Sequence, residues 1–166
     1  DLPAAVMVTQ HMPPGFTESL AKRLDRVSKL EVREAGGGEK ILPGQAYVAP
    51  GGYHLVVEGG RTSLSSAPPI QHVRPSADVM MESVAKYYGS GAIGVLLTGM
   101  GKDGAEGMAQ IKRNGGRTIV QDPSTAIISS MPLAAIKKGA ADKIAPLDKI
   151  ASSVMHLLSR EHGKER

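Results

Sequence analysis

Apolar and polar positions follow two different periods along the chain, and the changes of period divide it into strands and helices. Short apolar runs predict buried strands, and they cover residues 4–10, 92–98 and 117–121. A helix is predicted after the first run, because Phe16, Leu20 and Leu24 recur at helical spacing, with charged residues on the other side. The chain therefore opens with a strand followed by an amphipathic helix.

The stretch from residue 30 to residue 66 has a different pattern. Short alternating pieces such as EVREA, QAYVAP and YHLVVEG are separated by Gly-rich segments, which is typical of hairpins. We expect a β insertion here. Ser76 is then well placed as the N-cap of a helix that stops at Gly89.

The rest of the chain alternates between strand and helix. A helix is expected over residues 103–115, a short one after Pro132, a strand over residues 143–145, and an amphipathic helix over residues 147–158. This alternation predicts an α/β fold, a doubly wound, mostly parallel sheet with helices on both faces and a β-hairpin insertion. With 166 residues, the chain is expected to form a single domain, residues 1–166, with residues 30–66 as an insertion within it.

Composition narrows the possible functions. Aromatic residues make up 3% of the chain, so stacking platforms for nucleic acid are not expected. There is no Cys, which excludes disulfides and a thiol nucleophile, and no apolar run reaches the roughly 18 residues of a membrane span. The histidines lack metal-ligand spacing, so no metal and no cofactor are expected. We expect a cytoplasmic protein that neither binds nucleic acid nor inserts into a membrane.

Two loops follow predicted strands and carry polar side chains. His11 lies in the loop of residues 9–15, and Asp103 lies in the loop of residues 98–104. If both strands run parallel in one sheet, the two side chains emerge at the same edge, where sites of α/β folds form. A histidine with a carboxylate is the base and its orienting group in a nucleophilic triad.

The second loop allows three interpretations. Gly99, Gly101 and Gly104 spell G-x-G-x-x-G, and Asp122 follows at the distance of a ribose-binding acid, which together indicate a dinucleotide site. However, Asp103 places a carboxylate at the helix N-terminus that a pyrophosphate would occupy. Backbone N–H groups of a Gly-rich turn also form oxyanion holes for acyl transfer. A purely structural turn is the third interpretation.

The segments TQHMPPGFTESLAKRL, HVRPSADVM, LLTGMGKDGAEGM and SSMPLAAI, in this order, closely resemble the catalytic domain of the CheB protein-glutamate methylesterases of bacterial chemotaxis. The resemblance implies a serine hydrolase that removes methyl groups from γ-glutamyl methyl esters on chemoreceptors, and that in many members also deamidates receptor glutamines. It implies His11 as general base, Asp103 as its orienting carboxylate and the Met100 backbone N–H as an oxyanion donor.

The resemblance also implies further residues and partners. Substrate-binding positions would be Met12, Thr98, Gly99 and Gly101. Partners would be the cytoplasmic domains of methyl-accepting chemoreceptors, together with a receiver domain of the same protein in a two-component signalling system.

One departure from the family pattern concerns the nucleophile. In the family the serine lies in a G-x-S-T-G-G-type loop, and no such loop occurs in these 166 residues. We therefore expect that the first strand, the serine loop and the first helix are missing from the chain as given, which would then be inactive alone. Ser129 and Ser130 are poor substitutes, because neither lies in a strand-to-helix elbow. The alternative is a non-catalytic α/β module that binds a nucleotide or a protein through residues 99–104.

Overall fold

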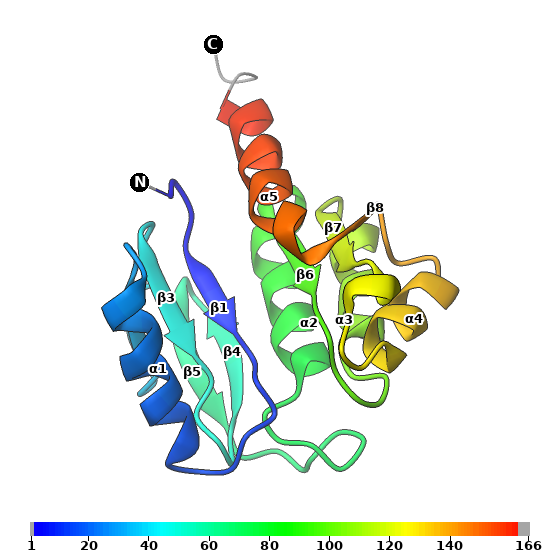
Figure 1. Ribbon diagram of the computed structural model, residues 1–166. Helices are drawn as coiled ribbons and strands as arrows, with labels where there is room; N and C mark the ends of the chain where they lie inside the picture. The colour runs from blue at the N-terminus through cyan, green and yellow to red at the C-terminus, as the bar shows by residue number, and fades with distance from the viewer. Residues whose placement is uncertain (1, 163–166) are drawn as a thin grey trace. The chain divides into compact units, whose positions relative to one another are not determined.

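The computed structural model describes the backbone of residues 2–162 (Figure 1). Side chains are described for residues 2–160. The chain forms two compact units, Asp1–Ser83 and Val84–Arg166. The boundary between them falls within helix α2 (Ala77–Tyr88). Each unit contains a parallel sheet, and the two are described separately.

The first unit is built on a three-stranded parallel sheet in the order β1-β3-β2. Its strands are β1 (Val6–Val8), β2 (Glu31–Glu34) and β3 (Gln45–Val48). Helix α1 (Phe16–Val27) covers one face, where Leu20 and Leu24 pack against a buried apolar cluster. The expected helix is confirmed, but Phe16 does not join this core, because its side chain is 60% exposed.

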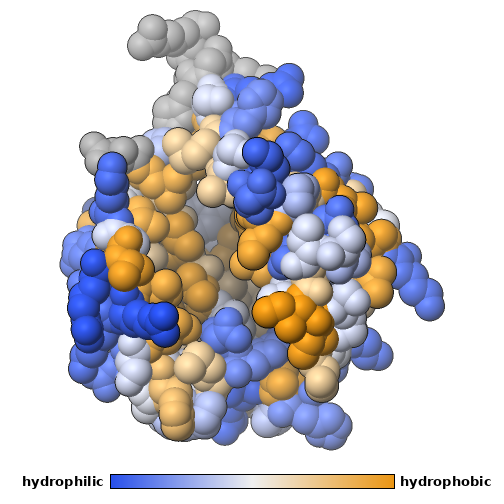
Figure 2. Space-filling view, in the orientation of Figure 1, coloured by the Kyte–Doolittle hydropathy of each residue, from blue (hydrophilic) through white to orange (hydrophobic). Residues whose placement is uncertain are grey.

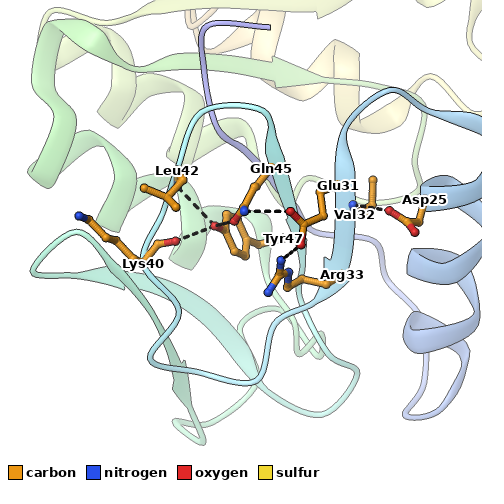
Figure 3. A network of polar contacts seen from close by, with 8 residues as sticks. All are labelled: Asp25, Glu31, Val32, Arg33, Lys40, Leu42, Gln45 and Tyr47. Carbon is orange, nitrogen blue, oxygen red and sulfur yellow. Dashed lines mark hydrogen bonds and ion pairs between the residues drawn. The ribbon is translucent and has the colours of Figure 1, made fainter. Parts of the chain in front are cut away.

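Polar contacts link the strands of this sheet to the segments around them (Figure 3). Tyr47 is fully buried; its hydroxyl donates to the Lys40 carbonyl oxygen at 2.7 Å and accepts from the Leu42 N–H at 3.3 Å. From α1, the Asp25 carboxylate accepts the Val32 N–H at 2.8 Å. These bonds satisfy backbone groups of β2 and of the segment between β2 and β3.

Only the second half of the segment from residue 30 to residue 66 forms a hairpin. Strands β4 (His54–Glu58) and β5 (Arg61–Ser65) pair antiparallel, whereas β2 and β3 run parallel to each other and to β1. The hairpin interpretation of EVREA and QAYVAP is therefore wrong. Alternation of apolar and polar residues is the same in parallel and antiparallel strands, so the pattern carried no information on strand direction.

The second unit is a three-stranded parallel sheet with helices on both faces. Its elements are β6 (Ile93–Leu96), α3 (Ala105–Arg113), β7 (Arg117–Gln121), α4 (Ser130–Lys137), β8 (Lys143–Ala145) and α5 (Leu147–His162), with short 3-10 turns at Gly89–Gly91 and Pro123–Thr125. On one face, Ile119 packs with Ile150 of α5. On the other face, Met108 and Ile111 of α3 lie so close to Gly94 that any side chain there would collide with them.

Helix boundaries agree with the expected signals to within a few residues: α3 is two residues shorter at each end than expected, and α5 extends four residues beyond residue 158. The Val79 N–H donates to Ser76 Oγ at 3.4 Å, so the predicted N-cap of α2 is confirmed. Helix α4 begins at Ser130, two residues before Pro132 and not after it. A proline is tolerated in the first turn of a helix, because the N–H it lacks has no intrahelical acceptor there.

The expected α/β class, with parallel strands, flanking helices and a β-hairpin, is confirmed. The parallel strands hydrogen-bond as two sheets of three, and β1 and β6 belong to different sheets within residues 2–162. Strand β1 is followed directly by the loop that carries His11, and β6 is followed directly by the loop that carries Asp103.

Candidate active site

In the first unit, the loop of residues 9–15 leads from β1 into α1 and carries His11 and Met12, both half-buried. The Ala49 N–H donates to the Val8 carbonyl oxygen at 2.8 Å, which continues the pairing of β1 with β3 up to the start of the loop. The Thr9 hydroxyl donates to Met80 Sδ at 3.2 Å. The loop therefore begins at a fixed point at the carboxyl end of β1.

Gly51 holds this loop from the other side. A Cβ atom at Gly51 would lie 2.5 Å from the Pro13 carbonyl carbon, 2.5 Å from the Pro14 nitrogen and 2.7 Å from the Met12 oxygen. The Gly51 N–H donates to Thr17 Oγ1 at 2.9 Å, which anchors Gly51 to the first turn of α1. The backbone that follows His11 is thus in direct contact with the backbone after β3, and only glycine allows this approach.

In the second unit, the loop of residues 98–104 follows β6 and is called the β6 loop. Three of its backbone N–H groups donate to acceptors elsewhere in the unit. The Thr98 N–H donates to Gln121 Oε1 at 2.8 Å, the Gly99 N–H to the Ile128 oxygen at 2.9 Å, and the Gly101 N–H to Ser130 Oγ at 3.0 Å. Between them, the Met100 N–H has no acceptor among residues 2–162. Met100 is also 74% exposed. The Met100 N–H is thus a backbone donor that this part of the loop leaves available to a ligand.

Gly99 allows the loop to lie against the start of α4. A Cβ atom on Gly99 would lie 2.3 Å from Met131 Sδ, and the Met131 N–H donates to the Gly99 oxygen at 3.1 Å. Gly101 has a φ of +91°, a conformation that glycine adopts without strain. The first two glycines of the motif therefore shape the turn around Met100.

Asp103 lies at the other end of the same loop and is 3% exposed. Gly104 follows as the N-cap of α3, and the Ala105 N–H donates to the Lys102 oxygen at 3.3 Å, so the backbone on both sides of Asp103 is held by the helix start. The helix dipole stabilises a negative charge at this end. A buried carboxylate and an available backbone donor are therefore three residues apart in one loop.

This geometry argues against the dinucleotide interpretation. The N–H groups of Thr98, Gly99 and Gly101, which would have to bind a pyrophosphate, are already used inside the unit. The acid expected at the ribose, Asp122, accepts the Ser124 N–H at 2.9 Å instead, and this hydrogen bond lowers the pKa of Asp122. Asp122 caps a turn.

The structure groups most of the predicted site residues in one loop. Thr98, Gly99, Met100, Gly101 and Asp103 lie together after β6, and His11 and Met12 lie together after β1 in the other unit. The pairing of His11 with Asp103 stays a prediction.

Three supporting residues of the β6 loop were missed by sequence reasoning: Gln121, Ile128 and Ser130. Gln121 ends a strand, and Ser130 belongs to SSMPLAAI, one of the segments that carry the family resemblance. The strand end at Gln121 and the SSMPLAAI segment around Ser130 were the sequence features that could have indicated these two residues. Ser130 was considered only as a substitute nucleophile.

Within residues 2–162, no cluster of three His, Asp or Glu side chains could hold a metal ion. The buried His54 uses both ring nitrogens on backbone groups, since Nδ1 accepts the Ser76 N–H at 3.1 Å and Nε2 lies 3.0 Å from the Pro68 oxygen. None of the helices in this range has the length and apolar character needed to cross a membrane.

Known proteins match this chain over nearly its whole length. The protein-glutamate methylesterase/protein-glutamine glutaminase of Symbiobacterium thermophilum is 50% identical over 155 residues, which cover 93% of this chain and 43% of that protein. The protein of the same name from Pyrococcus abyssi is 48% identical over 167 residues, 98% of this chain and 45% of that protein. The chain thus spans less than half the length of these curated relatives.

A solved structure and a family model agree with these relatives. The crystal structure of the Thermotoga maritima CheB methylesterase catalytic domain matches with a TM-score of 0.89 and 43% identity, over 94% of this chain and 85% of that one. The family model described as CheB methylesterase matches residues 1–154, a range that includes both strand-end loops. With His11 after β1, and with Asp103 and an available Met100 N–H after β6, this chain belongs to the CheB methylesterase family.

Proposed function

We propose that this chain forms the catalytic part of a serine-type protein-glutamate methylesterase. The observation that supports the proposal most directly is the β6 loop, in which neighbouring N–H groups are used internally and the Met100 N–H is available beside the buried Asp103. An unused backbone donor in a fixed turn can stabilise the charge that develops on a carbonyl oxygen. The proposed reaction is ester hydrolysis at a glutamyl side chain of a protein.

In the proposed reaction, a serine hydroxyl attacks the ester carbonyl carbon while His11 takes its proton. The negative charge that develops on the carbonyl oxygen is stabilised by the Met100 N–H, and Asp103 orients and stabilises the protonated His11. The bond to the methoxy oxygen then breaks, the proton passes from His11 to that oxygen, and methanol leaves. Water attacks the acyl-enzyme with the same base, which releases the glutamate side chain and restores the serine.

The nucleophile is proposed to lie outside these residues. No G-x-S-T-G-G-type loop occurs in residues 1–166. Strand β1 ends the strand order of the first sheet, and Val6, Met7 and Val8 are only half-buried. Figure 2 shows apolar side chains gathered over β1 and the strands beside it. An edge strand offers unpaired N–H and C=O groups, so we expect the serine-bearing strand to pair with this edge.

The proposed activities follow the names of the relatives, and the proposed setting follows the family resemblance of the sequence. Those proteins are named for methylesterase and glutaminase activities, so we propose both reactions for this family member. The proposed substrates are the cytoplasmic domains of methyl-accepting chemoreceptors, in chemotaxis adaptation in the cytoplasm. A receiver domain of the same full-length protein is the proposed regulator.

The test is methanol release from a methylated receptor by an enzyme in which this chain is joined to its serine-bearing segment. His11→Ala should lower kcat by about 10⁴-fold or more, because no base then takes the serine proton. His156→Ala is the matched control, since His156 is an exposed histidine on α5. Retained turnover in His11→Ala, with unchanged thermal stability, would contradict the proposed triad.

A further inference from the structure

The β6 loop shows how the oxyanion donor is held in place. We propose that Ser130 is a positioning residue that fixes the orientation of the Met100 N–H; the proposal rests on the function proposed above. Ser130 is the first residue of α4 and comes from a different part of the second unit than the loop it contacts. The inference concerns its hydroxyl group.

The Ser130 hydroxyl bonds to the residues on both sides of Met100. Oγ accepts the Gly101 N–H at 3.0 Å and donates to the Gly99 carbonyl oxygen at 3.0 Å. These two bonds fix the peptide groups that flank Met100, so they set the direction of its N–H. Among residues 2–162, the N–H and the carbonyl oxygen of Met100 itself take part in no backbone hydrogen bond.

Ser130 is itself held firmly. Thr98 Oγ1 accepts the Ile128 N–H at 2.9 Å and donates to the Ile128 oxygen at 3.0 Å, and the Met131 N–H donates to the Gly99 oxygen at 3.1 Å. The segments of residues 98–101 and 128–131 are therefore joined at both ends. A hydroxyl fixed in this way can orient a neighbouring peptide without a large entropy cost.

The same contacts argue against Ser130 as a nucleophile. Its one hydroxyl proton is given to the Gly99 oxygen, and an oxygen lone pair accepts the Gly101 N–H. The residue begins a helix and does not lie on a strand-to-helix elbow. Both hydrogen-bonding roles of the side chain are thus directed to the loop.

The proposal predicts a defined kinetic effect. In the enzyme joined to its serine-bearing segment, Ser130→Ala should lower kcat for ester hydrolysis by about 10- to 100-fold with little change in KM. The donor would remain but would be misdirected, and such displacements weaken the transition state more than the ground state. Ser130→Thr keeps the hydroxyl and should restore most of kcat.

The chain offers a matched control. Ser129 is adjacent, lies at the N-cap of α4 and makes no side-chain capping bond, so Ser129→Ala should leave kcat unchanged. A wild-type kcat in Ser130→Ala would overturn the proposal. An equal loss in Ser129→Ala would also overturn it, because the effect would then come from the helix start in general.

A second readout does not depend on activity. In the 166-residue chain, amide hydrogen exchange at Gly101 should be roughly fivefold faster or more in Ser130→Ala than in the wild type, since its acceptor is removed. Unchanged exchange at Gly101 would overturn the positioning role even if kcat fell. No turnover by the wild-type enzyme would instead refute the proposed function, whatever the exchange rates show.

Discussion

Gly51→Ala tests how tightly the His11 loop is held. The added methyl group would lie 2.5 Å from two backbone atoms of Pro13 and Pro14 and 2.7 Å from the Met12 oxygen. Ordinary contact requires about 3.5 Å between such atoms, so the loop must move by roughly 1 Å. Backbone cannot rotate away as a side chain end can, and overpacking of this kind costs about 1–3 kcal/mol.

We expect Gly51→Ala to have a melting temperature a few degrees lower than the wild type and a much lower kcat/KM. A domain of this size loses about 2–4 °C for each kcal/mol, and a 1 Å displacement near the reacting groups costs roughly 10²-fold in kcat/KM. Calorimetry and the methanol-release assay measure the two effects. Gly91→Ala is the control, because no atom lies within 4 Å of its Cβ position. Unchanged melting temperature and kcat/KM in Gly51→Ala would show that the loop of residues 9–15 is not held tightly against Gly51.

Two further predictions concern the second unit. Met100→Ala should leave kcat within about twofold, because the proposed donor is the backbone N–H and the side chain is 74% exposed; a large loss would assign a role to the side chain. The hydrogen bond from Lys138 and the charges of Lys138 and Arg113 lower the pKa of Glu106 despite partial desolvation. Its stabilisation, at most about 1 kcal/mol because solvent screens these half-exposed groups, is present above roughly pH 4.5 and lost as pH falls through the lowered pKa. The difference in melting temperature between wild type and Glu106→Gln should therefore be seen near neutral pH and vanish near pH 3; a constant difference would contradict it.

The local elements were predicted well where one residue pattern had one structural meaning. Strands β7 and β8 have the expected bounds, and α2 has its expected N-cap at Ser76. The prediction was wrong where a pattern had two meanings. Parallel and hairpin strands share a period of two, so β2 and β3 were taken for parts of hairpins. Apolar spacing also placed Phe16 on the buried side of α1, although this first residue of the helix is 60% exposed.

The chemical residues of the site were accessible from sequence, but their support was not. His11, Asp103 and Met100 follow strands and lie in segments that carry the family resemblance. Ser130 is 29 residues from Gly101, and nothing in the spacing of the two indicates that they hydrogen-bond. Whether Asp122 binds a ribose or caps a turn also depends on a contact, here with the Ser124 N–H.

By itself, the sequence determined the α/β class, the order of helices and strands and the two loops that carry polar side chains. Those properties follow from periodicity, capping and Gly-rich turns, which act over a few neighbouring residues. Tertiary contacts set the direction of β2 and β3, the close approach of Gly51 to the loop of His11 and the availability of the Met100 N–H. These depend on hydrogen bonds and backbone contacts between segments far apart in the chain, which no local pattern encodes.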